Sequence, residues 1–112
     1  MPFAIVRNDI TKMQVDAIVN SANPRAIVGG GVDRAIHQAA GAELLAARKK
    51  IGNIDTGTAA VTPAYRLHAR YVIHTVGPVW QDGSHGEREL LSRAYQNSLR
   101  LAVERDCSSI AF

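Results

Sequence analysis

Short apolar runs alternate with longer segments of helical periodicity along the chain. Turn-forming residues bound the runs and several contain β-branched residues, a combination that is typical of strands. The runs predict strands at residues 3–6, 17–19, 58–62, 71–76 and 109–112. The uninterrupted run 17–19 fits a strand that is buried on both faces. Because helical segments separate most of the strands, their order favours an α/β layered sheet.

Three segments have the residue spacing of helices that bury one face. The first begins near Val32 and is interrupted at Gly41, the second covers residues 43–51 and stops at Gly52, and the third covers residues 87–105. The predicted apolar face of the first helix consists of Val32, Ala35, Ile36, Ala39 and Ala40, and that of the third consists of Leu91, Ala94, Tyr95, Ala102 and Val103.

Length and composition indicate one ordinary folded domain. The chain has 112 residues, of which 46% are hydrophobic and 21% charged, so disorder is excluded. Its net charge of +3 and pI of about 9.4 suit a phosphate-bearing partner. No basic stripe is interleaved with aromatic residues, which argues against nucleic acid. The densest basic run is 48–50, where cations favour the dipole at a helix C-terminus.

The single cysteine, Cys107, excludes an intrachain disulfide and a site with several Cys ligands. This usage fits a reducing compartment, so we expect a cytoplasmic protein. We expect no signal peptide and no membrane span, because no apolar run has the required length or flanks. The four histidines show no metal-ligand spacing, and we predict structural roles for His37 and His74.

The segment from Val19 to Asp33 is the most informative one for function. It contains a buried strand, polar turn residues, the glycines Gly29–Gly31 and a helix start. Glycines let the backbone approach a ligand closely, and a helix N-terminus offers unpaired N–H groups, so the segment favours a phosphate site. The dinucleotide fingerprint fails because Arg34 replaces its last Gly, and no Walker A loop occurs. A glycine-rich turn that only packs against the sheet remains the alternative.

Two side chain types strengthen the case for a site. Asn20 and Asn23 follow a strand, at the edge where α/β sheets place their ligands. Asp33 begins the next helix, where an acid is often only a cap or a partner of the dipole. In combination with Asn23 and the glycines, a role of Asp33 in binding a sugar or a water is a competing interpretation.

Four segments resemble signatures of the macro domain family, in the family's order and spacing. They are residues 8–11, 19–24, 29–37 and 71–80, and the resemblance extends from Phe3 to Phe112. It implies a three-layer α/β/α fold with a mixed sheet flanked by helices, and a single macro domain over residues 1–112. It also implies binding of ADP-ribose or of ADP-ribosylated protein.

The resemblance assigns binding roles to particular residues. Asp9 is similar to the acid that accepts a hydrogen bond from the adenine amino group, with Ile10 supplying backbone beside it. Ala22 and Asn23 resemble the residues that hold the distal ribose. Gly29, Gly30, Gly31 and Val32 resemble the loop whose amides face the distal ribose and the pyrophosphate.

The resemblance also implies catalysis. Asn23 and Asp33 have the spacing found in the branch that removes ADP-ribose from proteins. In that branch the Asn positions the distal ribose, and the Asp orients or activates a water. Asn8, Val28 and Arg34 depart from the family pattern, and the last two are expected to reshape the distal ribose pocket.

The end of the chain departs furthest from the family pattern. Macro domains continue into a second glycine-bearing loop, a last strand and a helix, which this sequence lacks. We therefore expect a domain that is incomplete at its C-terminus. Weaker ligand binding and self-association through an unpaired sheet edge would follow.

Three functions compete at this point. The first is hydrolysis of ADP-ribose from modified proteins or deacetylation of O-acetyl-ADP-ribose, carried by Asn23 and Asp33. The second is a non-catalytic module that binds ADP-ribose or a related nucleotide, and the third is an RNA-associated regulator. None requires a cofactor or a metal; the family's zinc-dependent branch is not supported, because Cys107 lies far from the glycine loop.

Overall fold

Within residues 3–112, four strands form one mixed sheet in the order β2-β3-β1-β4. The computed structural model describes residues 3–112, and its strands are β1 (Ala17–Ser21), β2 (Ala59–Pro63), β3 (Tyr71–Thr75) and β4 (Ile110–Ala111). β3 and β4 both run parallel to β1, whereas β2 is an antiparallel edge strand on β3. The sheet is therefore mixed, as the sequence predicts.

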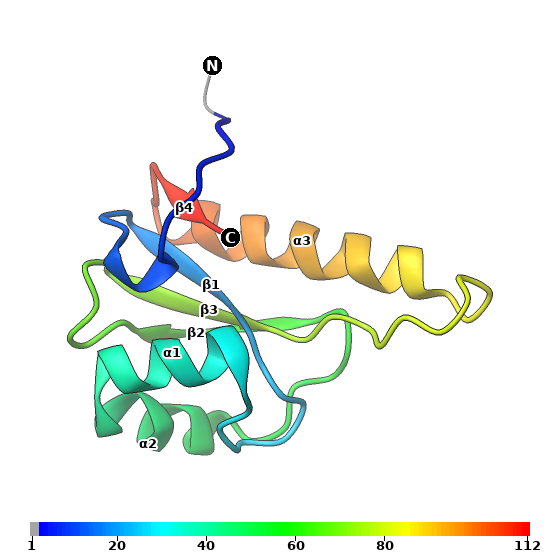
Figure 1. Cartoon of the computed structure of the whole chain (residues 1–112), viewed down its shortest axis with the longest axis horizontal. Coiled ribbons are helices and arrows are strands. Elements are labelled where there is room, and N and C mark those ends of the chain that lie inside the picture. Colours follow the sequence, from blue (N-terminus) through cyan, green and yellow to red (C-terminus); the bar gives the residue numbers. More distant parts are fainter. Residues whose placement is uncertain (1–2) are drawn as a thin grey trace.

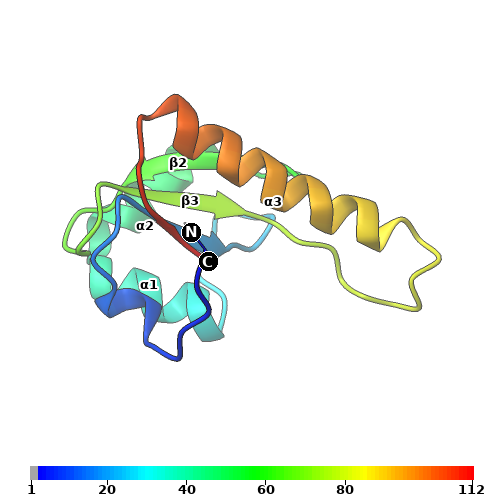
Figure 2. The same cartoon turned by 90° about the horizontal axis from the view of Figure 1, so that it is seen from above.

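Helices cover both faces of the sheet (Figures 1 and 2). α1 (Gly31–Ala40) and α2 (Ala42–Ile51) lie on one face, and α3 (Glu87–Glu104) crosses the other. A short 3-10 helix, η1 (Ile10–Lys12), precedes β1 and contacts α1. This arrangement confirms the predicted three-layer α/β/α fold.

The core is split by the sheet because successive strand residues point to opposite faces. Ile18 of β1 and Val72 of β3 pack with Ile36 and Leu44 on the face covered by α1 and α2. The residues next to them, Ala17, Val19 and Ile73, pack with Ala102 of α3 on the other face. Each large apolar side chain buried here contributes roughly 1.5–3 kcal/mol to folding.

The single residue Gly41 joins α1 to α2. Its φ is +93°, a value that L side chains rarely adopt, so the turn between the helices depends on glycine. A Cβ added there would lie 3.6 Å from the Arg66 side chain. The interruption predicted at Gly41 and the stop at Gly52 are both confirmed.

The predicted strand at residues 3–6 is wrong. Residues 3–9 have no regular secondary structure, and Phe3, Ile5 and Val6 are 67%, 88% and 63% exposed. An apolar run becomes a strand only when a neighbour completes its ladder of hydrogen bonds, and residues 3–6 pair with no strand among residues 3–112. The other predicted strands and all three helices are present, with ends shifted by one or two residues.

The buried faces of α1 and α3 differ from the predicted apolar faces. In α1 the residues Asp33 and His37 are buried together with Ile36 and Ala40, whereas Val32, Ala35 and Ala39 are exposed. In α3 the buried residues are Glu87, Ala94, Ser98 and Ala102, whereas Leu91, Tyr95 and Val103 are exposed. Asp33 of α1 has a polar partner in the sheet, Asn20 of β1, whereas Glu87 of α3 accepts hydrogen bonds from the loop before the helix and Ser98 donates to the Ala94 carbonyl within α3.

Among residues 3–112, no helix combines the length and the apolar character that crossing a membrane would require.

Candidate functional site

The glycine loop before α1 presents open backbone at a helix N-terminus. Gly30 is the N-cap of α1, and Gly31 begins the helix with a φ of +61°. A Cβ built at Gly30 or Gly31 would meet no atom within 4 Å, so the space beside both residues is free. Exposed N–H groups at the positive end of a helix suit an anion such as a phosphate.

Asp33 turns inward from the first turn of α1 and is only 4% exposed. Its Oδ2 accepts a hydrogen bond of 2.7 Å from the Gly29 N–H, and its Oδ1 accepts one of 2.7 Å from Asn20 Nδ2. His37 Nε2 lies 3.4 Å from the same Oδ1. The cap interpretation of Asp33 therefore has a structural basis, because its carboxylate holds the glycine loop against the sheet.

Asn23 lies in the loop that follows β1. Its side chain oxygen accepts a hydrogen bond of 3.0 Å from Arg25 N–H, which closes a local turn. The neighbouring Ala22 N–H donates to the Thr75 carbonyl at 2.8 Å and so continues the pairing of β1 with β3. Both residues predicted to hold the distal ribose thus lie at the carboxyl edge of the two central strands.

Arg48 fixes this loop from α2, a role that the sequence analysis missed. Its Nη2 donates to the carbonyl of Asn23 at 2.8 Å and to those of Pro24 and Arg25 at 3.4 and 3.2 Å. Its Nη1 donates to the Gly52 carbonyl at the end of α2. Burial lowers the pKa of Arg48 and the charge of Asp33 opposes that shift, so the guanidinium is a buried cation that joins helix to loop.

Asp9 and Ile10 lie at the start of η1, which contacts α1. Asp9 is the N-cap of η1, and its side chain accepts hydrogen bonds from Thr11 N–H and Thr11 Oγ1 at 2.9 and 2.7 Å. The Thr11 side chain is the main reason why the pKa of Asp9 is lowered. Ile10 packs against the core cluster that contains Ile36 of α1. The predicted adenine-side residues therefore sit beside the helix that the glycine loop begins.

A line of buried, hydrogen-bonded polar side chains, Asn20, His74 and Thr62, continues from Asp33 into the sheet. Asn20 Nδ2 lies 3.3 Å from His74 Nδ1, and His74 Nε2 lies 3.0 Å from Thr62 Oγ1. Burial lowers the pKa of His74 to about 4, and the positive charge of Arg48 acts in the same direction. The sequence signal for this line was the alternation of β3, which places His74 on the same face as Val72.

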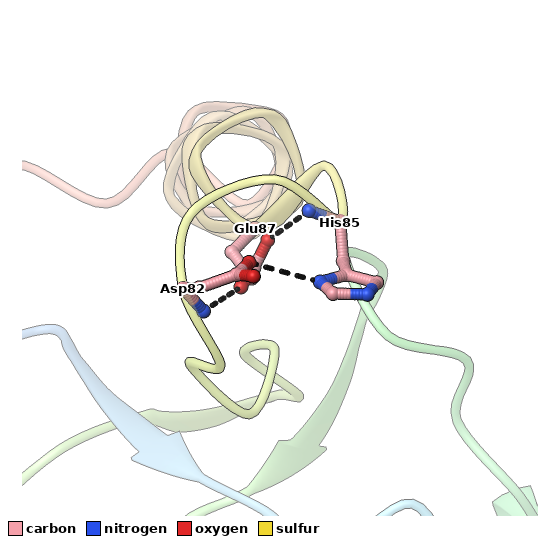
Figure 3. A group of neighbouring side chains, drawn as sticks. All are labelled: Asp82, His85 and Glu87. Carbon is pink, nitrogen blue, oxygen red and sulfur yellow. Dashed lines mark hydrogen bonds and ion pairs between the residues drawn. The ribbon is translucent and has the colours of Figure 1, made fainter.

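A second cluster of side chains lies at the N-terminus of α3 (Figure 3). Ligand atoms of Asp82, His85 and Glu87 lie within 4.8 Å of one another, although the spacing of the histidines had indicated no metal site. However, the Glu87 carboxylate accepts hydrogen bonds from the N–H groups of Gln81, Asp82, Gly83 and His85 at 2.6–3.2 Å. Because four N–H dipoles point at this carboxylate, its charge is already satisfied and a cation there would face their positive ends.

A cavity of about 140 Å³ opens at the carboxyl ends of β1 and β3, on the face covered by α3. Ser21, Thr75, Tyr95 and Phe112 contribute to its lining. Asn20 and His74 precede Ser21 and Thr75 by one residue, so they point to the opposite face. The cavity and the Asp33 cluster therefore lie on opposite sides of the same strand ends.

These features define a class of protein: a three-layer α/β domain with an open glycine loop, at a helix N-terminus, beside the carboxyl edge of its parallel strands. The family profile described as "Macro domain" matches residues 19–112. The chain belongs to the macro domain family.

Curated relatives and solved structures agree with this assignment. A macro domain-containing protein of Lactiplantibacillus plantarum is 56% identical over 108 residues, which cover 96% of this chain and 63% of the relative. An O-acetyl-ADP-ribose deacetylase of Citrobacter rodentium is 54% identical over 112 residues, which cover 96% of this chain and 63% of the relative. This chain therefore spans less than two thirds of the length of either relative.

Several of the similar structures contain a nucleotide, and two of them contain ADP. The Oceanobacillus iheyensis macrodomain with ADP has a TM-score of 0.87 and 42% identity, over 92% of this chain and 58% of that one. The Trypanosoma brucei macrodomain in complex with ADP has a TM-score of 0.85 and 43% identity, over 93% of this chain and 43% of that one. These two macro domains thus bind ADP.

Proposed function

We propose that the protein binds ADP-ribose across the glycine loop and hydrolyses an ADP-ribose derivative. The observation that carries the proposal is the open space beside Gly30 and Gly31 at the N-terminus of α1, next to the Asp33 carboxylate. The amides of this loop and of Val32 would face the pyrophosphate. Asp9 would accept a hydrogen bond from the adenine amino group, and Ala22 and Asn23 would hold the distal ribose.

The chemistry that we propose is addition of water to the substrate. With O-acetyl-ADP-ribose, water attacks the acetyl carbonyl, and the products are acetate and ADP-ribose. With a modified protein, water attacks the distal ribose carbon and the protein side chain leaves with a proton. The relatives from Citrobacter rodentium and Escherichia fergusonii that carry the name O-acetyl-ADP-ribose deacetylase support the first substrate.

Asp33 is the group that would orient the water. A carboxylate offers about four acceptor positions, and Gly29 and Asn20 each occupy one of those on Asp33, while His37 Nε2 lies 3.4 Å from Oδ1. Acceptor capacity therefore remains for a water bound beside the loop. The base would thus be held in one orientation by its other contacts, which is the arrangement that general-base catalysis requires.

A non-catalytic ADP-ribose-binding module is the second candidate. The observation that favours it is the same set of contacts, because a carboxylate that is 4% exposed and holds the Gly29 amide has a sufficient structural role. Such a module would bind ADP-ribose saturably and would release no product.

Calorimetric titration with ADP-ribose and an acetate-release assay test both candidates together. The hydrolase proposal predicts one-to-one binding, and a loss of turnover of about 100-fold or more in Asp33→Ala with much of the binding retained. Glu43→Ala is the control, because it removes an exposed acid from the first turn of the neighbouring helix α2. Binding without acetate release would select the module, and turnover that survives Asp33→Ala would remove Asp33 from the mechanism.

A further inference from the structure

Three neighbouring strands contribute one polar side chain each to the face covered by α1 and α2. Ile18 and Val72 belong to the core cluster on that face, so Asn20 and His74, two residues further along β1 and β3, point to the same side. Asn20 and His74 are direct register partners in the β1–β3 pair, and both are 0% exposed. Thr62 of β2 is also buried and contacts His74.

The chemistry of these groups fixes the direction of every hydrogen bond. Asn20 Nδ2 carries two protons and only donates, one to Asp33 Oδ1 at 2.7 Å and one to His74 Nδ1 at 3.3 Å. His74 Nδ1 is therefore an acceptor, and the ring proton is on Nε2, which donates to Thr62 Oγ1 at 3.0 Å. Thr62 Oγ1 donates in turn to the Pro63 carbonyl at 3.0 Å. Each group is thereby held in one orientation.

Burial and the neighbouring positive charges keep His74 neutral. Burial lowers its pKa to about 4, Arg48 of α2 and His37 of α1 act in the same direction, and Asp33 opposes them. Burial also lowers the pKa of His37. At neutral pH, His74 thus retains the lone pair on Nδ1 that orients the Asn20 amide.

Asn20 carries a cost that packing alone does not explain. Its Oδ1 is buried without a hydrogen-bond partner among the described residues, and an unsatisfied buried polar atom destabilises a fold. An apolar side chain at this place would avoid the cost. What Asn20 supplies instead is the pair of Nδ2 protons, which reach Asp33 and His74.

We propose that Asn20 and His74 are positioning residues for Asp33. His74 orients the Asn20 amide, the amide holds Oδ1 of Asp33, and Oδ2 is thereby aimed at the Gly29 N–H and the glycine loop. The consequence for catalysis rests on the proposed hydrolase function, whereas the effect on the loop does not depend on it.

His74→Leu and His74→Asn form the decisive pair of variants. Leu removes the acceptor for the Asn20 amide, whereas Asn can place its side chain oxygen near the former position of Nδ1. In the deacetylase assay we expect His74→Leu to lower kcat by about 10- to 100-fold with little change in KM, and His74→Asn to recover most of the loss. His68→Leu, at an exposed histidine, is the matched control and should leave both parameters unchanged.

A measurement that needs no ligand separates this proposal from the proposed function. In ¹H–¹⁵N NMR spectra the Gly29 amide reports its hydrogen bond to Asp33, and the side chain ¹⁵N shifts of His74 report the tautomer. We expect a neutral His74 with the proton on Nε2 at pH 7, and a Gly29 resonance that moves in His74→Leu and returns in His74→Asn. Should His74→Leu fail to fold, Thr62→Val removes the acceptor of Nε2 and should move the Gly29 resonance in the same direction.

The outcomes are distinct for the two ideas. A Gly29 resonance that is unaffected in folded His74→Leu or Thr62→Val, or a His74 ring protonated on Nδ1, would overturn the positioning role. Absence of turnover in the unmodified protein would overturn the hydrolase function, and the Gly29 resonance would still decide whether Asn20 and His74 position Asp33.

Discussion

Asp33 and Arg48 are two buried charges that do not contact each other, and each is stabilised by hydrogen bonds with backbone groups. Asp33 receives the Gly29 N–H, and Arg48 donates to the carbonyls of Asn23 and Arg25 in the loop after β1. Burial of a charge is tolerated when hydrogen bonds replace the lost water. The two residues thereby hold the two ends of the segment between β1 and α1, Asp33 as an acceptor near Gly29 and Arg48 as a donor near Asn23.

Replacing Arg48 by Met should destabilise the protein by about 2 kcal/mol, because charge-assisted hydrogen bonds to the Asn23, Arg25 and Gly52 carbonyls are lost while the length of the side chain is kept. ADP-ribose affinity should fall as well, since the Asn23 loop is released. Urea denaturation and calorimetric titration measure the two effects.

Lys49→Met is the control for Arg48→Met, because Lys49 lies in the same last turn of α2 and is exposed. It removes the same charge near the same helix end, and its effect should stay within about 0.5 kcal/mol. Equal effects of the two substitutions would mean that these basic residues stabilise the protein through the helix dipole and not through the carbonyl contacts of Arg48.

At the scale of an element, α3 is anchored at its first residue. Glu87 accepts hydrogen bonds from four N–H groups of the preceding loop, and the bond from Gln81 is the largest of the effects that lower its pKa to about 2. An acid in the first turn also favours the helix dipole. The loop from β3 to α3 therefore takes its shape from a single carboxylate.

Glu87→Gln should lower the thermal stability at pH 7 and matter less in acid. The folded pKa lies below the ordinary value of 4.5, so the stabilisation is fully present above about pH 4.5 and is lost as the pH falls toward 2. The difference in Tm between the protein and Glu87→Gln should thus be smaller at pH 3 than at pH 7. Glu89→Gln, which changes an exposed acid of the same turn, should differ only slightly in Tm from the protein at both pH values. A pH-independent difference for Glu87→Gln would contradict this account.

At the scale of the whole molecule, α3 has two apolar sides and the sheet covers only one. Ala94 and Ala102 are buried against the sheet, whereas Leu91, Tyr95, Leu99 and Val103 form an exposed stripe at a spacing of four residues, 44–72% exposed. Tyr95 packs on Phe112, with ring centroids 5.0 Å apart, so the stripe continues onto the end of the chain. A contiguous apolar surface of this kind favours association.

We expect this 112-residue chain to self-associate through the α3 stripe as its concentration rises. Leu99→Glu places a charge in the middle of the stripe and should lower the average mass in sedimentation equilibrium. Gln96→Glu adds the same charge at another exposed position of α3 and should leave the mass unchanged. A monomer at all concentrations, or equal effects of both substitutions, would exclude the stripe as the contact.

The order of strands and helices, the breaks at Gly41 and Gly52 and the glycine loop were all predictable from the sequence. They depend on periodicity and on turn residues that act over a few positions, so local sequence patterns are sufficient to predict them. Residues 3–6 show the limit of prediction from local patterns, because their apolar pattern is that of a strand but a strand also needs a partner strand. The same limit explains the exposed Val32 and Leu91, since helical spacing defines a face and only the packing decides which face is buried.

The sequence by itself thus determined the layered fold, the family and the place of the proposed anion site. Only the tertiary structure decided that Asp33 faces inward, that Arg48 holds the Asn23 loop, and that His74 lies beside Asn20, 54 positions away in the sequence. The physical reason is that buried polar groups are stabilised by partners from distant segments, and those partners are set by strand register and helix packing, which no local pattern encodes.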